Sequence, residues 1–87
     1  MRRITDVHMV GGTKHEHIAA VKWVDDAGPR GESTRAEMVS WIDGGGKAYV
    51  SHGTQKIAVG VVNAVPKYIR THADGVWTDN LLALPRY

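Results

Sequence analysis

The clearest hydrophobic pattern in the chain predicts one short helix within residues 34–46. Met38, Trp41 and Ile42 fall on one arc of a helical wheel, and polar residues occupy the opposite arc. Glycines at 44–46 end the helix, because glycine has poor helix propensity and accepts a left-handed cap. A helix this short is marginal alone in water, so it must pack on other elements.

The start of this helix carries a specific signal. Thr34 and Glu37 have the spacing of a capping box, in which each side chain accepts a hydrogen bond from the backbone amide of the other residue. Trp41 is the largest side chain on the apolar arc. We therefore expect Trp41 to be the main anchor between the helix and a sheet.

Alternating apolar and polar residues predict short strands on both sides of the helix. These strands are expected at residues 3–10, 15–24, 47–51, 55–62, 67–71 and 76–78. In the second of them, Ile18 and Val21 both require burial although they are an odd number of residues apart. A bulge near Ala19 and Ala20 would place both on one face. The polar stretch 25–32 contains glycine and proline and is expected to be a loop.

Together these elements indicate a single α+β domain over residues 1–87. We expect an antiparallel sheet of four to five strands with one short helix on one face, in the order strand-strand-helix-strand-strand-strand. One short helix leaves part of such a sheet uncovered. The apolar tail, with Trp77 and Leu82, is expected to cover it, and Asp79 or Asn80 to cap the turn that presents the leucines. A second subunit is the alternative cover.

Composition excludes several classes of function. Cysteine is absent, which rules out disulfides, thiolate zinc sites and thiol catalysis. No apolar run approaches transmembrane length, and Arg2 and Arg3 are not followed by an apolar signal core. We therefore expect a cytoplasmic protein with no membrane partner. The net charge of +2 gives only a weak attraction to polyanions.

Three histidines come nearest to a metal site. If residues 15–24 form a strand, His15 and His17 point to one face, and His8 on the neighbouring strand could supply a third ligand. Exposed polar side chains beside a turn explain the same residues and are favoured, because no known metal-binding spacing is present. We expect no metal, no cofactor and no catalytic residues, since no serine has a histidine–carboxylate partner at a recognisable spacing.

Basic and aromatic residues in the second half of the chain give an alternative site. Lys56, Lys67 and Arg70 could line one face of a sheet with Tyr68 beside them, and so contact nucleic acid or another anion. A solvated sheet face explains the same residues and is the favoured interpretation.

Four segments of the chain also match, in order, the segments of a known family. They are ITDV at 4–7, HIAAVKW at 17–23, TRAE at 34–37 and YIRTHADGVWTDNLLALP at 68–85. On these segments the chain resembles a family of small bacterial and phage proteins, the domain of unknown function numbered 3892. The resemblance covers nearly the whole chain. It implies a stand-alone domain of bacterial or phage origin, and it brings no established activity and no catalytic residues.

These observations favour a small non-enzymatic protein of phage or mobile-element type that acts in the cytoplasm, of the host if phage-encoded. Its expected partner is a host protein or a second copy of itself, as a homodimer. Two alternatives stay open: a nucleic-acid-binding domain that uses the basic sheet face, and an oligomer that sequesters a small anionic ligand. Salt-dependent retention on DNA separates the first alternative from the others.

Chelation tests the histidine cluster. If no structural metal is bound, a chelator should leave the melting temperature unchanged, because a structural metal would contribute directly to the free energy of folding. Thermal melts with and without the chelator, together with elemental analysis, measure this. Stoichiometric zinc, or unfolding on chelation, would contradict the interpretation of His8, His15 and His17 as ordinary polar residues.

Overall fold

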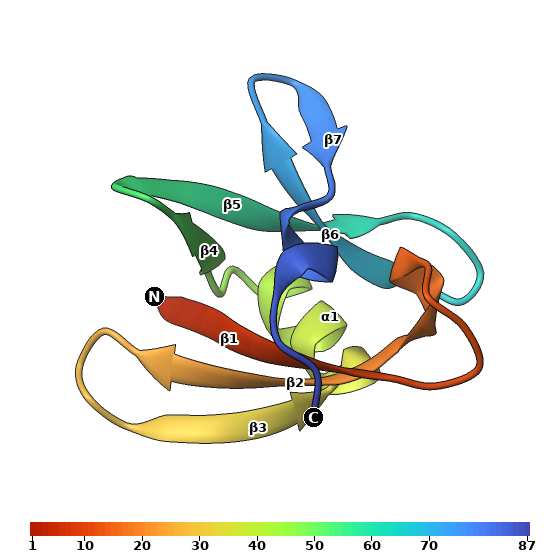
Figure 1. The fold of residues 1–87 in the computed structure, drawn as a ribbon, viewed down its shortest axis with the longest axis horizontal. Coiled ribbons are helices and arrows are strands. Elements are labelled where there is room, and N and C mark those ends of the chain that lie inside the picture. Colours follow the sequence, from red (N-terminus) through yellow and green to blue (C-terminus); the bar gives the residue numbers. More distant parts are fainter.

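A single seven-stranded sheet curls around one α-helix in the computed structural model, which describes all residues 1–87 (Figure 1). The strands are β1 (Arg2–Met9), β2 (Ile18–Asp25), β3 (Arg30–Thr34), β4 (Ala48–His52), β5 (Gln55–Val62), β6 (Tyr68–Ala73) and β7 (Val76–Thr78). The helix is α1 (Arg35–Asp43), and two 3₁₀ turns are η1 (His15–His17) and η2 (Asn80–Ala83). The strand order is β3-β2-β1-β4-β5-β6-β7.

The sheet is larger and more mixed than the sequence pattern predicts. It has seven strands rather than four to five, and β1 and β4 run parallel while every other neighbouring pair is antiparallel. The strand missing from the prediction is β3, which pairs with β2 from Arg30 to Thr34. This edge strand is mostly exposed and polar, with only Ser33 buried, so it has no apolar alternation to reveal it.

The predicted helix cap is confirmed. Thr34 Oγ1 accepts a hydrogen bond from the Glu37 amide at 3.2 Å, and Glu37 Oε1 accepts one from the Thr34 amide at 2.8 Å. The hydrogen bond from the Thr34 amide, together with that from the Thr34 side chain, favours the ionised carboxylate and lowers the pKa of Glu37. At the other end, Gly45 takes a positive φ of 106°, which only glycine adopts readily, and the helix stops at Asp43.

The predicted bulge in β2 is also confirmed. His8 pairs with Ala20 and Met9 pairs with Ile18, so Ala19 is the extra residue of the strand. Its insertion turns both Ile18 and Val21 toward the core, where each is fully buried.

The core lies on the concave face of the sheet, between its two halves. Its buried residues are Ile4, Val7, Ile18, Val21, Met38, Ala48, Val50, Val59, Ile69 and Leu81. The contribution of α1 is Met38, which is 0% exposed, rather than Trp41, which is only half-buried. Helix α1 contacts β2 and β3 on one side and β5 and β6 on the other, so it joins the two halves.

Trp41 packs at the edge of this core. The Arg2 guanidinium lies between two indole rings, 3.9 Å from the ring centre of Trp23 and 4.1 Å from that of Trp41. A Cβ on Gly46 would lie 2.3 Å from the Trp41 ring, so this close approach requires glycine. Trp41 therefore ties the end of α1 to the first strand.

The C-terminal segment covers the remaining part of the core. Leu81 is fully buried, and Leu82 and Leu84 pack against the core cluster. The chain then runs beside β1, where the Val7 amide donates to the Pro85 carbonyl at 2.9 Å. No helix in the structure has the length and apolarity that crossing a membrane requires.

Met38→Ala should destabilise the protein by about 2–5 kcal/mol, because it leaves a cavity where α1 enters the core. A urea titration of the variant and the parent measures the difference in unfolding free energy. Val65→Ala is the matched control, since Val65 is fully exposed and its truncation should change little. A loss below about 1 kcal/mol for Met38→Ala would mean that the helix is not anchored at this residue.

Truncation after Asp79 should abolish cooperative unfolding or expose dye-binding apolar surface. The truncated chain lacks Leu81, whose burial is worth about 1.5–3 kcal/mol, together with the backbone bonds to β1. Thermal melts and dye fluorescence measure both effects. A truncated chain that melts like the parent would show that the tail is not part of the core.

Candidate functional site

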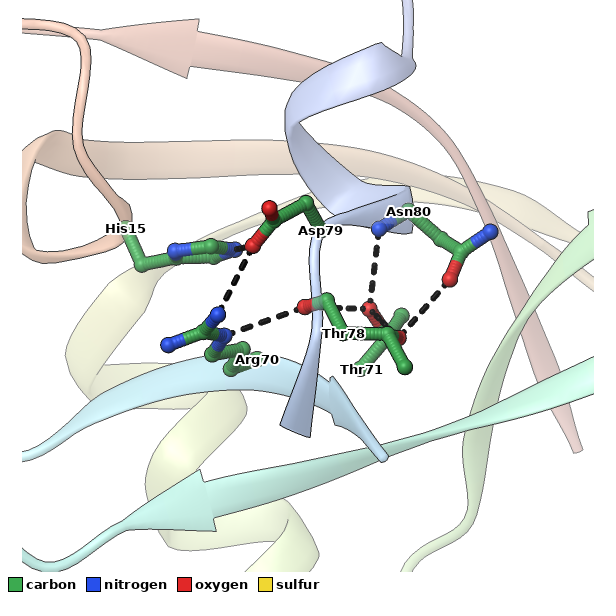
Figure 2. A network of polar contacts seen from close by, with 6 residues as sticks. All are labelled: His15, Arg70, Thr71, Thr78, Asp79 and Asn80. Atoms are coloured by element: carbon green, nitrogen blue, oxygen red, sulfur yellow. Dashed lines mark hydrogen bonds and ion pairs between the residues drawn. The ribbon is translucent and has the colours of Figure 1, made fainter. Parts of the chain in front are cut away.

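A polar network ties together η1, β6, β7 and the start of η2 (Figure 2). Its members are His15, Arg70, Thr71, Thr78, Asp79 and Asn80. The β6–β7 hairpin creates it, because its register places Thr71 opposite Thr78. The turn residues Asp74 and Gly75 both have positive φ, 52° and 78°, as the tight primed turns of hairpins require.

Thr71 lies at the centre of the network and is 0% exposed. Its hydroxyl donates to the Thr78 carbonyl at 3.0 Å and accepts from the Asn80 amide at 3.1 Å. The Thr78 hydroxyl lies 2.8 Å from Thr71 Oγ1 and 2.7 Å from Asn80 Oδ1, and it donates its one proton to either. These bonds fix the point where β7 turns into η2.

Of Asp79 and Asn80, the two residues expected to cap η2, Asn80 does not take the capping position. The residue that caps η2 is Asp79, and it makes no side-chain capping bond. Asn80 instead accepts from the Thr78 hydroxyl through its side chain, and its amide donates to Thr71. The polar tail residues hold the hairpin to η2 rather than extend the 3₁₀ turn.

Arg70 forms the charged part of the network. Its Nε donates to the Thr78 carbonyl at 3.0 Å, and its Nη2 donates to Asp79 Oδ1 at 2.7 Å. The Arg70 side chain is 30% exposed and that of Asp79 is 73% exposed, so water screens this ion pair.

His15 faces the same carboxylate from η1. It is 7% exposed, and its Nε2 lies 3.8 Å from Asp79 Oδ1 without a hydrogen-bond partner. Burial lowers the pKa of His15 below its ordinary value, and the positive charge of Arg70 lowers it further. Asp79 and Glu16 act in the opposite direction but do not reverse the shift. The shift favours the neutral imidazole.

The three histidines considered as metal ligands do not converge. The expectation that His15 and His17 share a strand face is wrong, because both lie in η1. The Nδ1 of His17 accepts from the Lys14 amide at 3.2 Å, and its ring lies over Gly12, where a Cβ would sit 2.5 Å away. His8 contacts the carbonyl of Tyr87. No group of three or more metal-ligating side chains is placed to hold an ion.

The four residues considered as a basic sheet face also have separate surroundings. Lys67 pairs with Asp43 at 3.1 Å, and Arg70 pairs with Asp79. Lys56 Nζ lies 4.8 Å from the ring centre of Tyr49. Tyr68 lines a surface groove of about 620 Å³, together with Glu16, His17, Arg35, Ala64, Val65 and Pro66. Two of the three positive side chains are therefore paired with carboxylates.

The β6–β7 hairpin presents apolar side chains to water and projects from the body of the protein (Figure 1). Val76 is 62% exposed and Trp77 is 40% exposed. The Trp77 ring packs over Gly60, where a Cβ would lie 3.3 Å from it, and meets the His72 ring edge-on at 4.9 Å. Trp77 is thus held in one position with part of its surface free, rather than buried as part of the roof.

Sequence reasoning left Thr71 and Thr78 unassigned, although a signal for them exists. The Asp74–Gly75 turn fixes the hairpin register, and counting outward from it pairs Thr71 with Thr78. No local pattern could have placed His15 beside this hairpin, because the two are far apart in the chain.

A known protein family matches nearly the whole chain. Residues 3–85 match the family described as a protein of unknown function (DUF3892), and the chain belongs to this family. The whole polar network lies within the matched residues. No curated protein and no solved structure matches the chain.

Thr71→Val should lower the unfolding free energy by about 1–3 kcal/mol, because it removes the acceptor of the Asn80 amide and one donor to the Thr78 carbonyl. Urea titration measures the loss. Thr54→Val in the β4–β5 turn is the matched control, since Thr54 is exposed. Equal stability of the two variants would show that the network does not hold the hairpin.

Proposed function

We propose that this protein is a small interaction module that binds a partner protein through the β6–β7 hairpin and catalyses no reaction. The observation that carries the proposal is the pair of exposed apolar residues Val76 and Trp77 on a projecting hairpin with a fixed root. Tryptophan is enriched among the residues that contribute most to protein–protein binding.

The setting of Trp77 favours binding. Its ring is already ordered by Gly60 and His72, so little side-chain freedom would be lost when a partner covers it. The hydrogen bonds of Thr71 order the backbone beneath it in the same way. Less conformational entropy is lost when a partner covers an ordered, partly exposed aromatic ring than when it covers a flexible side chain of equal area.

The position of β7 adds a second kind of contact. It is the last strand of the sheet, so one side of its backbone has no neighbouring strand. An extended segment of a partner could pair with this edge while its side chains meet Val76 and Trp77. The partner we propose is a host protein or a second copy of the chain.

The alternatives have less support in the geometry. A nucleic-acid surface needs free positive charge, whereas Lys67 and Arg70 are each paired with a carboxylate. An anion-sequestering site would face the same neutralisation.

We place the activity in the cytoplasm, and in the host cytoplasm if the chain is encoded by a phage. The absence of cysteine is compatible with a reducing compartment.

Val76→Asp and Trp77→Ala should abolish partner binding while the fold persists. The wild-type chain and both variants are used for capture from a host lysate, with proteins and nucleic acids both identified. For the partner found, each variant should weaken binding by at least about 30-fold, which corresponds to a contribution of about 2 kcal/mol. Melting curves establish that the variants remain folded.

Val65→Asp is the matched control, because it places the same charge on a fully exposed valine of the β5–β6 connection. It should bind like the wild type. Capture that is unchanged in Val76→Asp would refute the hairpin as the contact. Capture of nucleic acid with a steep salt dependence would instead favour the basic-face alternative. If the partner is a second copy, sedimentation should show a dimer that Val76→Asp dissociates.

A further inference from the structure

His15 lies in the seam of the curled sheet, which is the place where η1 from one half of the sheet contacts β6 of the other half. Strand β7 pairs only with residues 71–73 of β6, and η1 contacts β6 from the other half of the sheet. His15 is the one buried residue of η1. In Figure 2 its ring points toward the carboxylate of Asp79, with Arg70 beside both.

The surroundings of His15 accept a neutral imidazole better than a charged one. Its Nε2 is buried and makes no hydrogen bond, so a proton added there would find no acceptor at bonding distance. Asp79 Oδ1 is 3.8 Å away, already accepts from Arg70 at 2.7 Å, and belongs to a carboxylate that is 73% exposed. The Arg70 guanidinium adds positive charge on the same side.

Two negative groups oppose this effect. Asp79 faces His15 from the β7–η2 junction, and Glu16 lies next to it in η1. Burial and Arg70 outweigh them, and the pKa of His15 falls below 6.5. The closed state, in which η1 packs on β6, therefore binds fewer protons than an open state in which η1 has separated from β6.

We propose that His15 is an acid-sensitive latch: the neutral ring holds η1 on β6, and its protonation releases η1 and opens the seam. The sign follows from linkage. The stabilisation is complete above pH 6.5, the ordinary pKa of histidine, and it is lost as the pH falls from there through the lower pKa of the closed state. The latch acts in the fold itself and does not depend on which partner the hairpin binds.

A histidine titration by NMR tests the electrostatic part. His15 should titrate below 6.5, the other histidines serving as internal references. Asp79→Asn should shift the His15 midpoint downward, because it removes a negative neighbour. Arg70→Gln should shift it upward, because it removes a positive one. A His15 midpoint at or above 6.5, or one that neither variant moves, would overturn the proposal.

Hydrogen exchange tests the opening. Protection of the amides in and next to η1, corrected for intrinsic exchange, is compared at about pH 7.5 and about pH 5, which span the histidine range. The wild type should lose protection at the lower pH, and His15→Leu should not. His52→Leu is the control, because His52 is exposed at the end of β4, and it should behave like the wild type.

Wild-type protection that does not change with pH would refute the latch, as would an equal loss in His15→Leu. Should His15→Leu fail to fold, the NMR shifts in Asp79→Asn and Arg70→Gln still decide the question, since both substitutions are at partly exposed side chains.

Discussion

The structure depends on one constraint: a helix of nine residues must close the core of a seven-stranded sheet. A flat sheet of this width would leave most of one face in water. The sheet curls instead, so that α1 contacts both of its halves and Met38 enters the space between them. Leu81 covers the part that the helix does not reach. The burial of these two side chains, from distant segments, is what makes the curled form favourable.

Curling creates a second problem, which the polar network solves. On its side away from β5, β6 pairs with β7 only at residues 71–73, so the backbone groups where it meets η1 and η2 need other partners. The Thr71 hydroxyl and Arg70 Nε both donate to the Thr78 carbonyl, and the Thr71 hydroxyl accepts from the Asn80 amide. The same residues therefore close the sheet and fix the root of the β6–β7 hairpin, so structure and candidate function share one set of contacts.

Only those features of the fold that a few neighbouring residues encode could be predicted from the sequence. The capping box of Thr34 and Glu37 and the bulge at Ala19 could be predicted because each is encoded within a few neighbouring residues. The parallel pairing of β1 with β4 could not, because no local pattern encodes it. The polar edge strand β3 was missed because a strand without a buried face has no alternation. His15 was expected on a strand as an exposed polar residue, with metal binding as the less favoured alternative, because the residues that surround it in the fold lie far away in sequence.

The β6–β7 hairpin is ordered by contacts on both of its faces. Its second strand has only three residues, and a two-stranded hairpin is marginal by itself in water. It is ordered here because Thr71 is buried below it and because Trp77 packs on Gly60 and His72 above it. Full burial of the tryptophan would stabilise the hairpin further, yet the fold leaves 40% of it exposed. A binding partner could cover this ordered, partly exposed aromatic ring at low entropic cost, and this is the physical basis of the role in recognition that we propose for the hairpin.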